Sequence, residues 1–440
     1  MGPRSGRAAA RRTALVSAAA LLAAACSDAG PPARTSAPAS EASSAAATEP
    51  ERDGADLDGA DADGATIDGA SVDQATLDRR LRAAAWADDV PRARRLVRRG
   101  GDVNAKDDTE QSAYLIATSE GHLELLRLAL RSGARVNDKD GWNGTGLIRA
   151  AERGHWLVVG ELLRAGIDRD HVNRIGYQAV HESIWLGEET PGYAATVRVL
   201  AAGGVELDRA SGSEGLTPLA MAQERGNGTA VRTLARILGR PAPADADAAL
   251  LRAAATGDAD GVAAALRAGA DIETRDPRRR TPLLLAVTGD HVAAAQVLVA
   301  LGASPDALDA QHDTPWLVTG VTGSVAMLQT LLPAHPDLTI RNRYGGLSVI
   351  PASERGHVAY VRRVVRTGID VDHVNDLGWT ALLEAVILGD GGPRHTRVVR
   401  ILLRAGADPT IADGDGVTPR RHAELRGFTS MAEILARAGG

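Results

Sequence analysis

Apolar and polar residues follow one another along most of this chain in a pattern that predicts pairs of short helices. A clear example begins at Thr281, whose hydroxyl can cap a helix, and Pro282 fits the first helical turn. Gly289 allows the chain to reverse, and the apolar pair at 297–298 indicates a second helix. Gly302 then permits the left-handed turn that ends this second helix. The segment therefore predicts a helix, a reversal and a second helix.

The same frame recurs from about residue 79 onward with a period near 33 residues, which gives about eleven units over roughly four fifths of the chain. Other copies stand at residues 137–141, 217–219, 341–345, 380–382 and 418–419. The frame resembles the ankyrin repeat, although residues 145–147, 178–180 and 314–316 depart from its Thr-Pro-Leu signature. The resemblance implies an all-α solenoid of helix-turn-helix units with hairpin fingers, and the departures affect unit boundaries rather than fold class.

A longer internal similarity divides the solenoid into two blocks. Residues 81–85 match 251–255, and residues 152–155 match 354–357 at an offset larger by about one repeat. An internal duplication in which one copy gained or lost a unit explains this shift. Two prolines between the copies, Pro241 and Pro243, interrupt any helix. We therefore expect a first block of about five units at 79–240, a linker at 241–247, and a second block of about six units at 248–440.

The N-terminus has the three parts of an export signal: arginines, an apolar stretch at about 13–25 that is too short to span a bilayer, and small residues before Cys26. Residues 22–26 resemble the lipobox of bacterial lipoproteins, whose cysteine carries the lipid. Cys26 is the only cysteine in the chain. We expect a signal peptide at 1–25 and a lipid-anchored protein of the cell membrane, facing the periplasm or the outside. A secretory signal with a chance cysteine is the alternative.

Between this signal and the solenoid lie two segments of simple composition. Residues 26–53 are rich in Ala, Ser, Pro, Thr and Glu, which is typical of a disordered, flexible tether. Residues 54–78 repeat every five residues and resemble pentapeptide repeats, which wind into a β-helix. Five pentapeptides are few for a stable coil, so an acidic extension of the tether and a small cap on the solenoid remain open.

Charge is distributed unevenly along the chain. The net charge is −6, residues 1–25 carry four arginines, and residues 26–78 carry twelve acidic side chains against two arginines. The remaining residues are therefore net neutral. Because nonspecific nucleic-acid affinity comes from clustered cations, a neutral body without a basic stripe predicts no nucleic-acid partner. We expect contact with a membrane through the lipid anchor only.

Both copies keep residues beyond the repeat consensus, and these are candidate partner-binding positions. His171 and Glu182 in the first block correspond to His373 and Glu384 in the second. Extra residues at 186–191 and 388–393 lengthen the turn between the two helices of one unit, and insertions in repeat proteins often contact partners. Common descent, with the Asp-His-Val-Asn motif merely shaping a finger, is the alternative.

The sequence offers little support for catalysis. One Asp-His pair per copy provides too few ligands for a metal, and the familiar nucleophile, phosphate-loop and zinc motifs are absent from the sequence. Histidines 122, 155, 291 and 357 follow an inter-helical glycine or its equivalent, where a structural role is expected. We expect neither an enzyme nor a bound cofactor.

Tryptophan is scarce, so its placement is informative. Trp142, Trp316 and Trp379 fall near finger-to-helix junctions, where the resemblance places a binding groove, and large aromatic side chains are natural interface anchors. Trp86 and two others, at 156 and 185, are expected to pack between helices. Burial of all six in the core is the alternative.

The function expected from these features is an envelope-anchored, monomeric scaffold or regulator that binds another protein in the groove. An enzyme with an unrecognised site in the inserted loops, and a passive spacer, are the alternatives.

Overall fold

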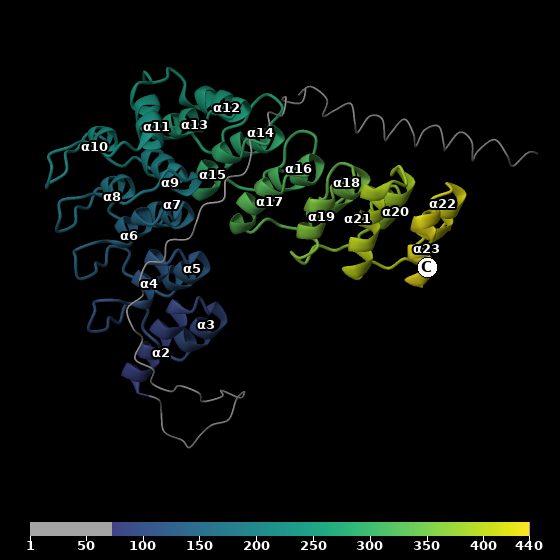
Figure 1. Ribbon diagram of the computed structural model, residues 1–440, viewed down its shortest axis with the longest axis horizontal. Helices are drawn as coiled ribbons and strands as arrows, with labels where there is room; N and C mark the ends of the chain where they lie inside the picture. Colours follow the sequence, from purple (N-terminus) through teal and green to yellow (C-terminus); the bar gives the residue numbers. More distant parts are fainter. Residues whose placement is uncertain (1–72, 440) are drawn as a thin grey trace, which may run out of the picture. The chain divides into compact units, whose positions relative to one another are not determined.

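The computed structural model describes residues 73–439, so the signal peptide, the tether and residues 54–72 of the pentapeptide segment lie outside the described residues. Residues 74–78, expected to belong to that segment, lie in the first helix instead. The described chain forms eleven pairs of antiparallel helices (Figure 1). The first block contains α2 (Gln74–Trp86), α3 (Val90–Arg98), α4 (Ala113–Ser119), α5 (Leu123–Arg131), α6 (Gly146–Glu152), α7 (Trp156–Arg164), α8 (Ala179–Trp185), α9 (Pro191–Ala202), α10 (Pro218–Glu224) and α11 (Gly228–Leu238).

The second block contains one more helix pair than the first. Its helices are α12 (Ala246–Thr256), α13 (Ala259–Arg267), α14 (Pro282–Thr288), α15 (Val292–Ala300), α16 (Pro315–Thr322), α17 (Val325–Leu331) with the 3-10 turn η1 (Leu332–Ala334), α18 (Val349–Glu354), α19 (Val358–Val364), α20 (Ala381–Ile387), α21 (Pro393–Arg404), α22 (Pro419–Leu425) and α23 (Thr429–Arg437). The described residues contain no β-strand, only an isolated bridge between Lys139 and Thr145. The all-α repeat fold is confirmed.

Local sequence explains the helix ends of the unit that begins at Thr281. In α14 the Thr281 side chain accepts the backbone N–H of Leu284, and Pro282 occupies the first turn. Gly302 follows α15 with φ +94°, which a side chain would disfavour. The caps predicted from the sequence are therefore present in this unit.

Eight of the connections between units are fixed by one aspartate or asparagine each. Its carboxylate or amide oxygen accepts two backbone N–H groups, two and four residues further along the chain, which closes a tight turn. The residues with this arrangement are Asp107, Asp140, Asn173, Asp276, Asp309, Asn342, Asn375 and Asp413.

Histidines tie successive units together. The Nε2 of His155 lies 3.1 Å from the Ser119 carbonyl of the preceding unit, and His291 and His357 make equivalent contacts. The structural role predicted for these three histidines is confirmed.

The two helix layers behave differently at the junction between the blocks. First helices of neighbouring units pack on one another throughout each block, but α10 and α12 do not pack closely. Second helices continue to stack across the junction through α11 and α13. In addition, α13 and α15 pack against α9, and α15 packs against α7, so that the two blocks meet through their second helices (Figure 1).

This interface between the blocks is close and partly ionic. A Cβ at Gly160 of α7 would lie 2.3 Å from the carbonyl oxygen of Ala300, so only glycine permits this approach. Asp260 of α13, almost fully buried, accepts Arg198 Nε of α9 at 2.7 Å. Arg267 donates to the carbonyl of Val205 at 2.6 Å. The blocks are therefore held together by specific contacts besides the linker.

No helix in the described part of the chain is both long and apolar enough to cross a membrane.

Candidate partner-binding site

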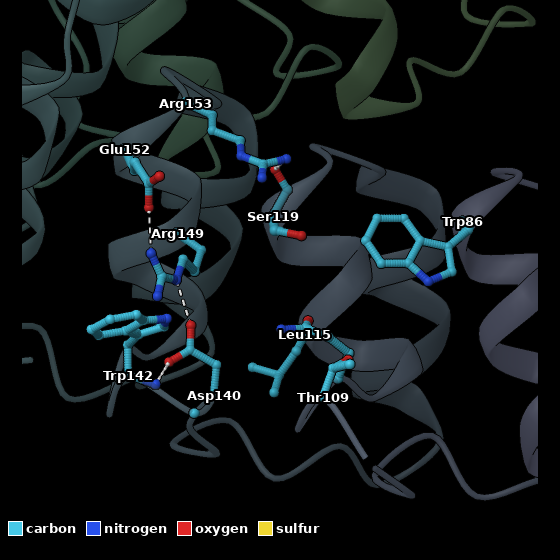
Figure 2. Close-up of a pocket in the computed structure, with 11 residues that line it drawn as sticks. Trp86, Thr109, Leu115, Ser119, Asp140, Trp142, Arg149, Glu152 and Arg153 are labelled. Atoms are coloured by element: carbon cyan, nitrogen blue, oxygen red, sulfur yellow. Dashed lines mark hydrogen bonds and ion pairs between the residues drawn. The ribbon is translucent and has the colours of Figure 1, made fainter. Parts of the chain in front are cut away.

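A cavity of about 520 Å³ lies along the first three units, where fingers and first helices meet (Figure 2). Its lining comes from the ends of α2, α4 and α6 and from the two fingers between them. The lining residues are Trp86, Thr109, Gln111, Leu115, Ser119, Asp140, Gly141, Trp142, Arg149, Glu152 and Arg153.

Two exposed tryptophans flank this cavity on opposite sides in Figure 2. Trp142 stands at a finger tip and is 63% exposed, because its backbone N–H is held by Asp140 while its ring projects outward. Trp86 ends α2 and is 53% exposed. The predicted placement of Trp142 in the groove agrees with the structure, whereas the interpretation of Trp86 as a helix-packing residue is wrong.

The charged residues of the cavity mostly pair with one another. Arg149 donates to Asp140 and, at 2.7 Å, to Glu152, and Arg153 pairs with Glu120. Burial lowers the pKa of Arg149, but its hydrogen bonds to the two carboxylates outweigh this and raise it. The cavity thus presents two aromatic faces around an internally neutralised floor, an arrangement suited to apolar side chains rather than to a polyanion.

The two other tryptophans proposed as anchors are not on the surface. Trp316 is 1% exposed and Trp379 is 7% exposed. Trp316 lies in the first turn of α16, on the side that packs into the core, and Trp379 follows the turn residue Asn375 by four positions rather than two. A ring at that position folds into the unit, so neither side chain is presented to a partner in this structure.

The duplicated polar residues serve the fingers. His171 Nε2 lies 2.7 Å from the Asn143 carbonyl of the preceding finger, and His373 lies 2.6 Å from the Gly345 carbonyl. Glu182 accepts the side-chain amide of Asn173 at 2.6 Å inside its own unit. Glu384 accepts the amide of Asn375 at 2.8 Å in the same way. These contacts favour the alternative in which the motif shapes and connects the fingers.

The two copies differ in the charges around the buried glutamate. Burial raises the pKa of Glu384 to about 8, the nearby Glu354 carboxylate adds to this, and the Asn375 hydrogen bond opposes it. Burial also raises the pKa of Glu182, but there Arg149 opposes the shift. At the position equivalent to Arg149 the second copy has Pro351. Glu384 therefore lacks the cation that partly stabilises its counterpart.

Among the described residues no group of three or more histidine, cysteine or acidic side chains is placed to hold a metal ion. Of the two tryptophans that line the cavity, Trp142 was predicted from the sequence as a groove residue and Trp86 was not. Helix position alone gives no signal for this, because Trp185 also ends its helix but packs partly buried against the core.

Comparisons with known proteins agree with this architecture. The family model described as "Ankyrin repeats (3 copies)" matches residues 81–173, and the model "Ankyrin repeat" matches residues 278–310 and 377–414. The putative ankyrin repeat protein YahD of Escherichia coli K12 is 38% identical over 190 residues, which cover 43% of this chain and 94% of that protein.

Solved structures and one enzyme also show similarity. The crystal structure of an ankyrin repeat domain from Acinetobacter baumannii AYE is 43% identical, covers 43% of this chain and 97% of that chain, and has a TM-score of 0.42. L-asparaginase of Dirofilaria immitis is 30% identical over 40% of this chain, but the match spans only 29% of that enzyme. Ankyrin repeats generally mediate binding to other proteins. With YahD matched over nearly its whole length, this chain belongs to the ankyrin-repeat family.

Proposed function

We propose that the protein is an exported, envelope-anchored scaffold or regulator, monomeric, that binds a segment of another protein between Trp86 and Trp142. The observation that supports this most directly is that both exposed tryptophans flank one cavity. Aromatic anchors of this kind contribute most of the binding energy at protein interfaces. Because the cavity floor is internally neutralised, the bound segment would present an apolar or aromatic side chain.

Replacing both rings, as Trp86→Ala with Trp142→Ala, is expected to lower partner capture at least tenfold while the fold is kept, since both side chains are largely exposed. A photo-reactive residue placed at Glu110, which has an exposed side chain close to Gly141 of the cavity, would record capture in intact cells.

The matched control replaces two apolar side chains that are exposed elsewhere, Leu238→Ala with Leu425→Ala. The same crosslinked protein should persist in this control. Equal crosslinking in both double variants would show that the cavity is not the binding site.

The anchoring part of the proposal rests on Cys26, which lies outside the described residues. The Cys26→Ser variant should move from the detergent phase to the aqueous phase when cells are extracted and phase-separated, because a lipid chain would be absent. A neighbouring change, Ser27→Ala, should leave the protein in the detergent phase. Identical partitioning of the wild type and Cys26→Ser would contradict lipid attachment at this cysteine.

A further inference from the structure

Two neighbouring second helices of the second block, α19 and α21, carry a concentration of arginine and no acidic residue. Seven arginines on these helices and the turn after α19 are exposed. They are Arg362, Arg363, Arg366, Arg394, Arg397, Arg400 and Arg404. We call this set the arginine face.

Helical spacing places the arginines of each helix on one side. In α21 they follow one another by three or four residues, whereas His395, Val398, Val399 and Leu402 between them are buried. Because α19 and α21 are neighbours that pack directly on one another (Figure 1), their outer sides adjoin. The arginine face therefore presents its charges in one direction, away from the core.

None of these seven side chains makes a hydrogen bond or ion pair with the described residues. This differs from arginines such as Arg149 and Arg198, which have carboxylate partners nearby. The expectation of a body without a basic stripe is thus wrong for these helices. The net charge summed over a long segment concealed this basic surface, because the compensating carboxylates lie on other elements.

We propose that the arginine face binds the anionic headgroups of a phospholipid bilayer. The inference rests on the proposed anchoring, which would keep the body near a membrane; residues 27–72, fully extended, span roughly 150 Å. Charge complementarity supports this occupant, because arginines near an anionic surface each add to membrane attraction. Tyr360, the one aromatic residue of these helices, is buried, so the surface lacks the exposed rings on which single-stranded nucleic acids stack.

The test uses the chain from residue 27 onward, which keeps every described residue and lacks Cys26. Sedimentation with vesicles of phosphatidylcholine and phosphatidylglycerol should show binding that weakens with salt, and vesicles of phosphatidylcholine alone should show none. Replacing the four α21 arginines, at 394, 397, 400 and 404, with glutamine should reduce the partition coefficient at least a hundredfold.

The matched control removes four other exposed arginines, Arg135, Arg174, Arg278 and Arg279, which lie on the finger side of the units. This variant has the same net charge as the α21 variant and should bind within a few fold of the wild type. Equal losses in both variants, or binding to duplex DNA without binding to vesicles, would overturn the proposal. Because the tested chain lacks Cys26, a failure of lipid attachment would appear only in the Cys26→Ser experiment above.

Discussion

Replacing Glu384 with glutamine is expected to abolish a loss of stability that the wild-type protein undergoes between about pH 4.5 and pH 8. The glutamate is 5% exposed, and burial together with the Glu354 carboxylate raises its pKa from 4.5 to about 8. The protonated form is neutral and can still accept the Asn375 amide, and glutamine reproduces both properties.

The direction of the effect follows from proton binding. Since the folded-state pKa lies above the unfolded value, the folded protein holds the proton more tightly, and its stabilising contribution is complete below pH 4.5. As the pH rises toward 8, the unfolded chain releases this proton first, which costs about 1.4 kcal/mol of unfolding free energy per pH unit. Above about pH 8 the loss is complete.

Urea unfolding of the wild type and of Glu384→Gln, each at pH 5 and pH 8.5, measures how the unfolding free energy depends on pH. The variant should be close to the wild type at pH 5 and more stable by several kcal/mol at pH 8.5. Glu182→Gln is the matched control, and its gain should be smaller because Arg149 opposes the pKa shift of Glu182. Parallel pH dependences for the wild type and Glu384→Gln would contradict the interpretation.

The second large effect is expected at the interface between the blocks. Asp260→Asn should lower the unfolding free energy by about 3 kcal/mol, because it leaves Arg198 without a charged partner in a largely buried position. Arg236 pairs with the same carboxylate at 3.4 Å but is mostly exposed, so the loss of this second ion pair contributes less to the fall in unfolding free energy. Chemical unfolding followed by circular dichroism provides the measurement.

Asp258→Asn is a matched control on the same helix. Asp258 pairs with Arg240 at 2.6 Å, but both side chains are exposed to solvent, and asparagine can keep the cap that Asp258 provides to α13. Because the pair is exposed, Asp258→Asn is expected to lower the unfolding free energy by less than about 1 kcal/mol. Similar losses in the two variants would show that the buried pair has no special role in joining the blocks.

Features set by residues close in sequence could be predicted, whereas features that depend on distant contacts could not. The cap at Thr281, the turn at Gly302 and the inter-unit role of His155 follow from spacing, because each acts within its unit or on the unit beside it. The fold class followed from the same repetition.

The candidate site was only partly predictable. Trp142 and Trp379 both lie at fingers, but two and four positions after the turn residue, and that difference decides between exposure and burial. The arginine face could have been predicted from the spacing of the arginines within residues 394–404. The charge summed over the whole repeat array is close to zero and does not reveal it. The packing of α9 against α13 has no local signal, because it joins helices of different blocks.

The packing of second helices between the blocks also limits how this array can change in length. In an open stack each unit contacts only its neighbours, so a unit can be duplicated or lost almost anywhere. Here α7 and α9 have fixed partners in α13 and α15, and a unit inserted among them would pair the wrong surfaces, with a side chain at the Gly160 position against the Ala300 backbone. Gain and loss of units are therefore least tolerated where the second helices of the two blocks meet, and the units there must be inherited together.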